Sequence, residues 1–393
     1  MAEHALSGLR VLDLTHYIAG PFCTKLLAGH GAEVIKIERP DGGDGARRLG
    51  PFPGDVPHPE KSALFLYLNT SKKGITLNLK TATGRTLFRE LVRQADVVVE
   101  NFAPRVLPSL GLDYPALAEL NPHIVLVSIS NFGQTGPYRD YQAADITEFA
   151  LSGHMNSFGD PQREPLKYGG APSQYMAGLN AYYATMAAVF HAARTGEGQQ
   201  VDVSIQEALT TAHGQALIQY EYTGTVARRS RGGMEFPCQD GPIHIVDQQP
   251  QQWARFTELI GQPELAQDPR FRTASDRREH AQELVEAVSV WTRQHTKEEV
   301  YHLAQGVRIP TSYPTSTADL LASAQLQARG FFIEIDHPAT GPVTYPGAAY
   351  EMRGLSWVWG PAPQLGQHNV EVYCGRLGYS KADLVRLRQS NVI

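Results

Sequence analysis

The sequence predicts an α/β protein that has a parallel sheet in a larger domain, followed by a second, smaller domain. Over the first 130 residues, short apolar runs typical of buried strands alternate with segments that have the periodicity of amphipathic helices. After about residue 222 the composition changes, and helical patterns continue to about residue 325. At roughly 100–200 residues per domain, a chain of 393 residues has room for two or three domains.

The first strand, helix and second strand follow one another closely. The apolar run 11–14 predicts a buried strand, and residues 22–28 predict a helix that Gly29 and Gly31 end. Residues 33–38, with three apolar side chains, predict the next strand. This order implies a parallel pair joined by a right-handed crossover.

The alternation continues to residue 205. Apolar residues at i, i+4 spacing predict a helix over 85–95, and strands are expected over 96–99, 124–129 and 201–205. Residues 177–194 predict a helix rich in Ala and Gly. Small side chains let helices approach closely, so this helix is expected to be buried or to lie at a subunit contact.

The second domain is expected to be mainly helical. Helices are predicted over 253–259, 277–291 and 296–303, and Thr296 with Glu299 forms a capping box at the start of the third.

The domain boundaries follow from this pattern. We expect a large domain at 1–222, a small domain at 223–328, and a segment at 329–393 that returns to the large domain. Residues 329–360 are rich in Gly and Pro, which predicts a linker, and Ser380 opens a last helix.

Composition excludes several classes of function. There are 35 Lys and Arg against 40 Asp and Glu, and a net charge of −5 argues against nucleic-acid binding. Cys23, Cys238 and Cys374 lack the spacing of a disulfide framework or zinc site, so no metal is expected. No signal-peptide pattern or membrane-length apolar run is present, so we expect a cytoplasmic protein that does not bind membranes.

The turn at 15–21 carries no GxGxxG, which argues against dinucleotide binding in that form. GxxxxGK[ST], GxSxG and HExxH are also absent. The segments that do carry a signal are LSGLRVLDLTH at 6–16, AGP at 19–21, GAEVIKIERP at 31–40, LNTSKK at 68–73, ADVVVENF at 95–102, GQTGP at 133–137, TGEGQ at 195–199, ARGFF at 328–332 and GQHN at 366–369. In order and spacing they resemble the class III CoA-transferases, the superfamily of formyl-CoA transferase, carnitine CoA-transferase and α-methylacyl-CoA racemase.

The resemblance implies a Rossmann-like large domain, a smaller α+β domain and two chains interlocked as a dimer. It also implies that coenzyme A binds as an acyl-CoA substrate. The residues at the matching positions are His16, Ile18, Ala19, Arg39, Lys72, Asn101, Phe102 and Arg105. Arg39 and Lys72 would approach phosphate or adenine, since cations neutralise phosphates. Ile18 stands where formyl-CoA transferase carries Gln, and Ser109 near where it carries Arg.

The nucleophile position departs from the family. The resemblance implies an Asp four residues before a Gly that opens a small-residue helix. Its carboxylate attacks the thioester, forms a mixed anhydride and then accepts CoA. Here Gln174 precedes Gly178 by four residues. A neutral amide does not form that anhydride.

The racemase branch is not matched either. Its His corresponds to Ala144, its Asp to Gln174, and its Glu falls near Pro237. The carboxylates that remain are Asp145 and Glu148, which would share one face of a helix. Such a pair can split its pKa values and act as acid and base. The alternative is that Asp145 caps the helix that follows it.

Three functions remain open. The chain is either the Asp-lacking subunit of a hetero-oligomeric CoA-transferase, a stand-alone acyl-CoA lyase, decarboxylase, isomerase or hydrolase, or a CoA-binding protein without catalysis. Some family members pair a subunit that carries the Asp with one that lacks it. The expected partners are therefore an acyl-CoA, a carboxylic acid, and a second chain in a homodimer or in a heterodimer with an Asp-bearing homologue.

Overall fold

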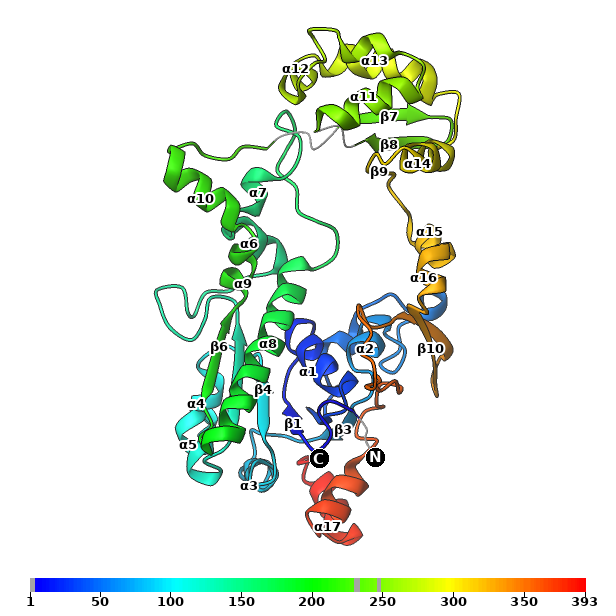
Figure 1. The fold of residues 1–393 in the computed structure, drawn as a ribbon. Helices are drawn as coiled ribbons and strands as arrows, with labels where there is room; N and C mark the ends of the chain where they lie inside the picture. Colours follow the sequence, from blue (N-terminus) through cyan, green and yellow to red (C-terminus); the bar gives the residue numbers. More distant parts are fainter. Residues whose placement is uncertain (1–3, 230–233, 246–248) are drawn as a thin grey trace. The chain divides into compact units, whose positions relative to one another are not determined.

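The computed structural model describes residues 4–229, 234–245 and 249–393 (Figure 1). The chain forms two compact units. The large unit consists of Met1–Phe158, Pro165–Ala227 and Gly330–Ile393, and the small unit consists of Gly159–Glu164 and Arg228–Arg329. The short piece 159–164 belongs to the small unit although it interrupts the large one, a feature that the sequence pattern does not suggest.

A six-stranded parallel sheet forms the centre of the large unit. Its strands are β1 (Arg10–Asp13), β2 (Glu33–Glu38), β3 (Lys73–Thr76), β4 (Val97–Glu100), β5 (Val125–Ser130) and β6 (Gln200–Ser204). The spatial order is β3-β2-β1-β4-β5-β6, and Val11 of β1 pairs with Val34 on one side and Val97 on the other. This is the doubly wound order, so the predicted α/β class and Rossmann-like sheet are confirmed. The strand order reverses between β1 and β4, where such sheets bind ligands.

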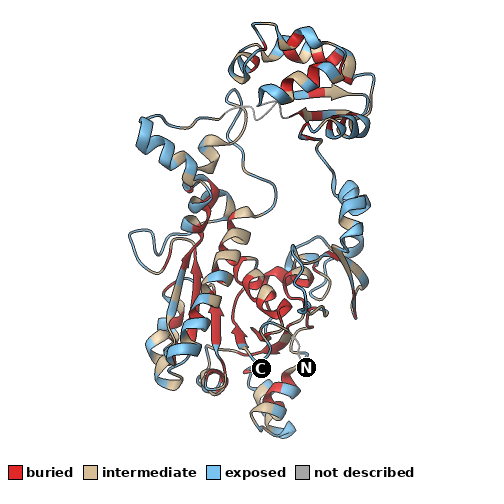
Figure 2. Ribbon diagram, viewed as in Figure 1, coloured by how far each residue is buried: buried red, intermediate tan, exposed pale blue. Residues whose placement is uncertain are grey.

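Helices cover both faces of this sheet. The helices of the large unit are α1 (Ala19–Gly29), α2 (Ala63–Leu68), α3 (Ala82–Val92), α4 (Val106–Leu110), α5 (Tyr114–Leu120), α6 (Asp145–Leu151), α7 (His154–Ser157), α8 (Pro172–Thr195), α9 (Ile205–Thr211), α10 (Gly214–Thr223) and α17 (Lys381–Gln389). Short 3₁₀ turns lie at Gly45–Arg48 and Pro53–Asp55. Leu12 belongs to the same buried apolar cluster as Phe88 of α3, whereas its neighbour Val11 belongs to the cluster that contains Ala177 of α8. Strands buried on both faces explain the continuous apolar runs in the sequence (Figure 2).

Helix α8 is longer than predicted. It begins at Pro172 rather than Ala177, with the proline in the first turn, where its missing N–H costs no hydrogen bond. A Cβ on Gly178 would lie 2.5 Å from the carbonyl oxygen of Ala19, so only glycine lets α8 approach α1 this closely. Ala177, Gly178, Ala181 and Ala188 of this helix are therefore buried within the large unit, whereas Ala187 and Ala193 are exposed.

The small unit combines an antiparallel sheet with helices. Its strands are β7 (Glu235–Cys238), β8 (Gly241–Ile245) and β9 (Thr311–Ser312), and its helices are α11 (Pro250–Leu259), α12 (Ala274–Glu279), α13 (Ala281–Thr292), α14 (Lys297–Gly306), α15 (Thr317–Ala322) and α16 (Ala324–Ala328), with a 3₁₀ turn at Pro263–Ala266. The predicted helix 277–291 is wrong in extent, because the backbone at His280 is not helical and separates α12 from α13. The predicted capping box of Thr296 and Glu299 is confirmed at the start of α14.

The C-terminal segment rejoins the large unit. Residues 329–360, predicted as a linker, contain an antiparallel hairpin of β10 (Phe332–His337) and β11 (Gly341–Pro346). A π-helical turn, Val370–Arg376, then packs on the sheet, and the Tyr373 hydroxyl donates to the Thr76 carbonyl at 2.7 Å. Within the described ranges, no helix has the length and apolarity that crossing a membrane requires.

Candidate active site

Three of the predicted residues meet at the carboxyl ends of β1 and β4. The backbone N–H of His16 donates to Oδ1 of Asn101 at 2.8 Å, and Nδ2 of Asn101 donates back to the His16 carbonyl at 2.8 Å. The rings of His16 and Phe102 lie 5.8 Å apart. Because β1 and β4 are the strands between which the sheet order reverses, these residues lie where this fold class binds ligands.

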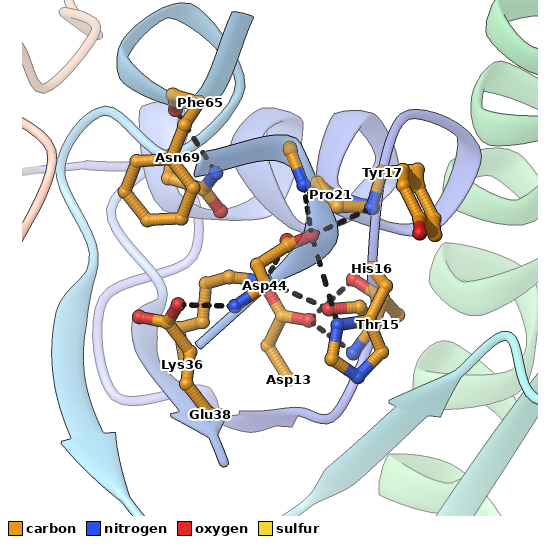
Figure 3. A network of polar contacts seen from close by, with 12 residues as sticks. Asp13, Thr15, His16, Tyr17, Pro21, Lys36, Glu38, Asp44, Phe65 and Asn69 are labelled. Atoms are coloured by element: carbon orange, nitrogen blue, oxygen red, sulfur yellow. Dashed lines mark hydrogen bonds and ion pairs between the residues drawn. The ribbon is translucent and has the colours of Figure 1, made fainter. Parts of the chain in front are cut away.

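A buried ion pair holds the loop that carries His16 (Figure 3). Nζ of Lys36 lies 3.0 Å from Asp44 and donates to the Thr15 carbonyl at 2.7 Å. Oδ1 of Asp44 accepts from the Tyr17 backbone N–H at 3.0 Å and lies 3.6 Å from Nδ1 of His16. Tyr17 has φ of +64°, a conformation that non-glycine residues rarely adopt. Burial opposes the charge of Asp44, but Lys36 and the hydrogen bonds from His16 and the Ala46 backbone together outweigh burial and hold the pKa of this carboxyl well below its usual range.

Lys72 does not have the geometry of a phosphate ligand. Its side chain is buried, and Nζ lies within hydrogen-bond distance of four protein oxygens, on Asp13, Pro21, Thr24 and Asn69, at 2.7–3.0 Å. An ammonium has three hydrogens, so none is left for a phosphate. Burial lowers the pKa of Lys72 to about 8. The prediction for this residue is therefore corrected: Lys72 joins α1 to β1 from inside the fold.

The other predicted CoA contacts lie around the same edge. Arg39 directly follows β2 and is exposed, and Arg105 is exposed at the start of α4. Among the described residues, neither guanidinium makes a hydrogen bond or ion pair, so both are free to meet an anion. Ala19 is buried as the first residue of α1, and Ile18 precedes it with a partly exposed side chain.

Gln174 and Glu148 form a hydrogen-bonded pair between α8 and α6. Nε2 of Gln174 donates to Oε2 of Glu148 at 2.9 Å. The Asn131 amide, in the orientation that satisfies its neighbours, donates to Oε1 of Glu148 at 3.1 Å. Glu148 is fully buried, and burial, together with the nearby Asp145, raises its pKa to about 7 although Gln174 favours the charged form. A carboxyl of this kind exchanges a proton near neutral pH.

Asp145 does not cap its own helix, which was one of the two alternatives that the sequence left open. It is the first residue of α6, whose N-cap is Ala144. Its Oδ1 accepts from the backbone N–H of Ser173, in the first turn of α8, at 3.1 Å, and its Oδ2 pairs with Lys167 at 2.9 Å. The expectation that Asp145 caps its own helix is wrong, because the carboxylate satisfies the start of the neighbouring helix instead.

Sequence reasoning missed three residues near these groups. Asn131 directly follows β5. Its position, as a polar residue at the carboxyl end of a parallel strand, could have identified it as a candidate site residue. Lys167 lies in an irregular segment, and no feature of the sequence around it predicts that it belongs to the site. Glu100, at the end of β4, accepts from the Phe102 backbone N–H at 2.8 Å, and burial raises its pKa to about 7.

A cavity of about 240 Å³ lies beside the Phe102 loop. Its polar lining includes Glu100, Ser128, Gln134, Arg139 and Gln200. In the part of the chain that the structure describes, no three His, Cys, Asp or Glu side chains converge in the manner of metal ligands.

Comparison with known proteins gives a consistent result over the whole chain. The sequence model of CoA-transferase family III matches residues 6–369. The chain is 33% identical to the formyl-CoA:oxalate CoA-transferase of Streptomyces avermitilis, over 99% of both proteins. It is 33% identical to the succinyl-CoA:(R)-benzylsuccinate CoA-transferase subunit BbsE of Thauera aromatica, over 97% of both. The solved structure of a CAIB/BAIF family protein from Brucella suis is 30% identical and superimposes with a TM-score of 0.86, covering 95% of this chain and all of that one.

Proposed function

Because this chain belongs to CoA-transferase family III, we propose that it takes part in transferring CoA between an acyl-CoA and a carboxylic acid, as the subunit whose nucleophile position holds Gln174. The proposal rests above all on one observation. Gln174, whose amide donates to Glu148, lies four residues before Gly178, the spacing at which the resemblance to the family implies a carboxylate.

Binding of CoA is assigned to the carboxyl edge of the sheet. His16, Asn101 and Phe102 would contact the nucleotide, with Ile18 and Ala19 beside it at the start of α1. Arg39 and Arg105 would neutralise phosphates, because they are exposed cations without a protein partner among the described residues. Lys72 is not part of this set.

The missing carboxylate would come from a second chain. Gln174 donates its amide hydrogen to Glu148, and an amide oxygen is too weak a nucleophile to open a thioester. A partner that carries Asp at the matching position would supply both the attacking oxygen and the carbonyl that later accepts CoA. The likeness to a protein named as a transferase subunit supports this arrangement.

The direct test is to assay the chain alone and together with a family III homologue that carries Asp at the matching position. We expect no CoA transfer from succinyl-CoA to a carboxylic acid by the chain alone, and transfer by the co-purified pair. Replacing the partner's Asp by Ala should abolish the activity without separating the pair. Transfer by the chain alone would refute the subunit proposal.

A second candidate has one observation in its favour. Glu148 is buried, has no cationic partner among the described residues, and has a pKa near 7, which suits a general acid or base. A stand-alone lyase, decarboxylase, isomerase or hydrolase would use it on an acyl-CoA. Turnover of an acyl-CoA by the chain alone that disappears in Glu148→Gln and survives in the exposed control Glu119→Gln would favour this candidate.

A further inference from the structure

Lys25 is a buried cation that no anion neutralises. It lies on α1 with a side chain only 6% exposed. Its ammonium lies over the ring of Tyr67, 3.3 Å from the ring centroid. Within the described ranges of the chain it makes no ion pair or hydrogen bond. Burial, with a smaller contribution from Lys72, lowers its pKa to about 7. A buried charge without a counter-charge is costly, and a cation–π contact offsets only part of that cost.

Two phenols lie in the same neighbourhood. Phe22, three residues before Lys25 on α1, meets the ring of Tyr175 edge to face at 5.0 Å. Burial and the nearby Tyr67 raise the pKa of Tyr175 to about 12, so this phenol keeps its proton at neutral pH. Neither the Tyr67 nor the Tyr175 hydroxyl has a hydrogen-bond partner among the described residues. The Lys25 ammonium and the two tyrosine hydroxyls are therefore hydrogen-bond donors for which the described residues supply no anionic acceptor.

We propose that Lys25, Tyr67 and Tyr175 form a subsite for a carboxylate, namely the second carboxylate of a dicarboxylic substrate. Tyr175 and Gln174 both lie at the start of α8, Tyr175 against Phe22 of α1 and Gln174 against Glu148 of α6, so one helix end links this subsite to the position where the first carboxylate would react. A carboxylate there gains one charge-assisted and two neutral hydrogen bonds, and it supplies the charge that Lys25 lacks. The inference rests on the proposed function, to which it adds a substrate class.

The test compares two acids of equal chain length that differ by one carboxylate. Succinate and butyrate are titrated into the full chain by calorimetry, so that binding is measured without any need for CoA transfer. We expect wild type to bind succinate at least tenfold more tightly than butyrate. Lys25→Met should bring the two affinities within about threefold, Lys25→Arg should keep the preference, and the exposed control Lys80→Met should behave as wild type.

Lys25→Gln provides a second neutral variant in case Lys25→Met folds poorly. Circular dichroism checks that both variants are folded. Equal binding of the two acids by wild type overturns the subsite, as does a preference that survives in both neutral variants. Succinate binding that depends on Lys25 in a chain that transfers no CoA with any partner supports the subsite and refutes only the proposed function.

Discussion

The buried carboxylates of the large unit are of two kinds, those that lie against a lysine and those that have no cation beside them. Asp13 and Asp44 lie against Lys72 and Lys36, which hold their pKa values well below the usual range. Glu148 instead meets only amides, so burial dominates and its pKa rises to about 7. The paired carboxylates support the backbone near His16, whereas Glu148, like Glu100, is able to exchange a proton near neutral pH.

The raised pKa of Glu148 makes folding depend on pH. Its pKa is about 7 in the folded chain against an ordinary 4.5, so the folded state holds this proton more tightly and stability falls as pH rises through that window. Urea unfolding should therefore show that the free energy of unfolding falls between pH 5 and pH 8. This fall should be larger in wild type than in Glu148→Gln by roughly 1–3 kcal/mol. Glu119→Gln, an exposed control, should follow wild type. Equal losses in all three proteins would show that Glu148 is ionised throughout.

Arg39 tests the proposed phosphate contacts. Arg39→Ala removes an exposed guanidinium that has no protein partner among the described residues, so the fold should keep its stability while CoA binding weakens by about 1–3 kcal/mol. Arg48→Ala is the matched control, since that exposed arginine already donates to the Gly42 carbonyl. Calorimetry that finds the same CoA affinity in Arg39→Ala and wild type would remove Arg39 from the site.

At the scale of elements, the crossing of α1 and α8 positions the site. Helix α8 brings Gln174 against Glu148 of α6, and its first turn is satisfied by Asp145. One turn further on, Gly178 lies against the backbone of α1 at Ala19. The amide at the nucleophile position is thus fixed by contacts on both sides of the helix.

Gly178→Ala should separate α8 from α1. The added Cβ would lie 2.5 Å from the Ala19 carbonyl oxygen and 3.1 Å from the Phe22 ring, and backbone does not yield as a side chain does. We expect a loss of about 1–3 kcal/mol in the free energy of unfolding, despite the better helix propensity of alanine. Gly214→Ala, where a Cβ meets no atom within 4 Å, should be neutral or slightly stabilising. Unchanged stability of Gly178→Ala in denaturant would mean that the helices are not in close contact.

Most of the central sheet was predictable from the sequence, because strands such as β4 and β5 are runs of apolar residues. Strand β3, with the sequence KGIT, was not predicted, because it has no such run. Strand β2 was predicted to the residue. Long-range contacts were not predictable, since nothing local in the sequence indicates that Lys72 turns inward to Asp13 or that Lys167 reaches Asp145. The break at His280 was missed because neither Gly nor Pro marks it in the sequence. Gln174 was recognised from the spacing to Gly178, whereas its bond to Glu148 required the fold.

At the scale of the whole molecule, we expect a dimer. Helices α8 and α10 carry large apolar side chains that the single chain leaves in solvent, among them Phe190 at 63%, Ile218 at 61% and Tyr222 at 87% exposure. Apolar patches of this kind mark interfaces between proteins. Light scattering at micromolar concentration should give twice the 43.2 kDa of one chain. A stable monomer would contradict both the interlocked dimer and the proposal of a partner subunit.

The central claim is that Gln174 occupies a nucleophile position without being a nucleophile. Mass spectrometry of the intact chain after incubation with an acyl-CoA tests it most directly. We predict no covalent adduct on wild type or on Gln174→Asn, and an acyl or CoA adduct on Gln174→Asp that peptide mapping places at residue 174. An adduct on wild type, mapped to Glu148 or Asp145, would contradict the account.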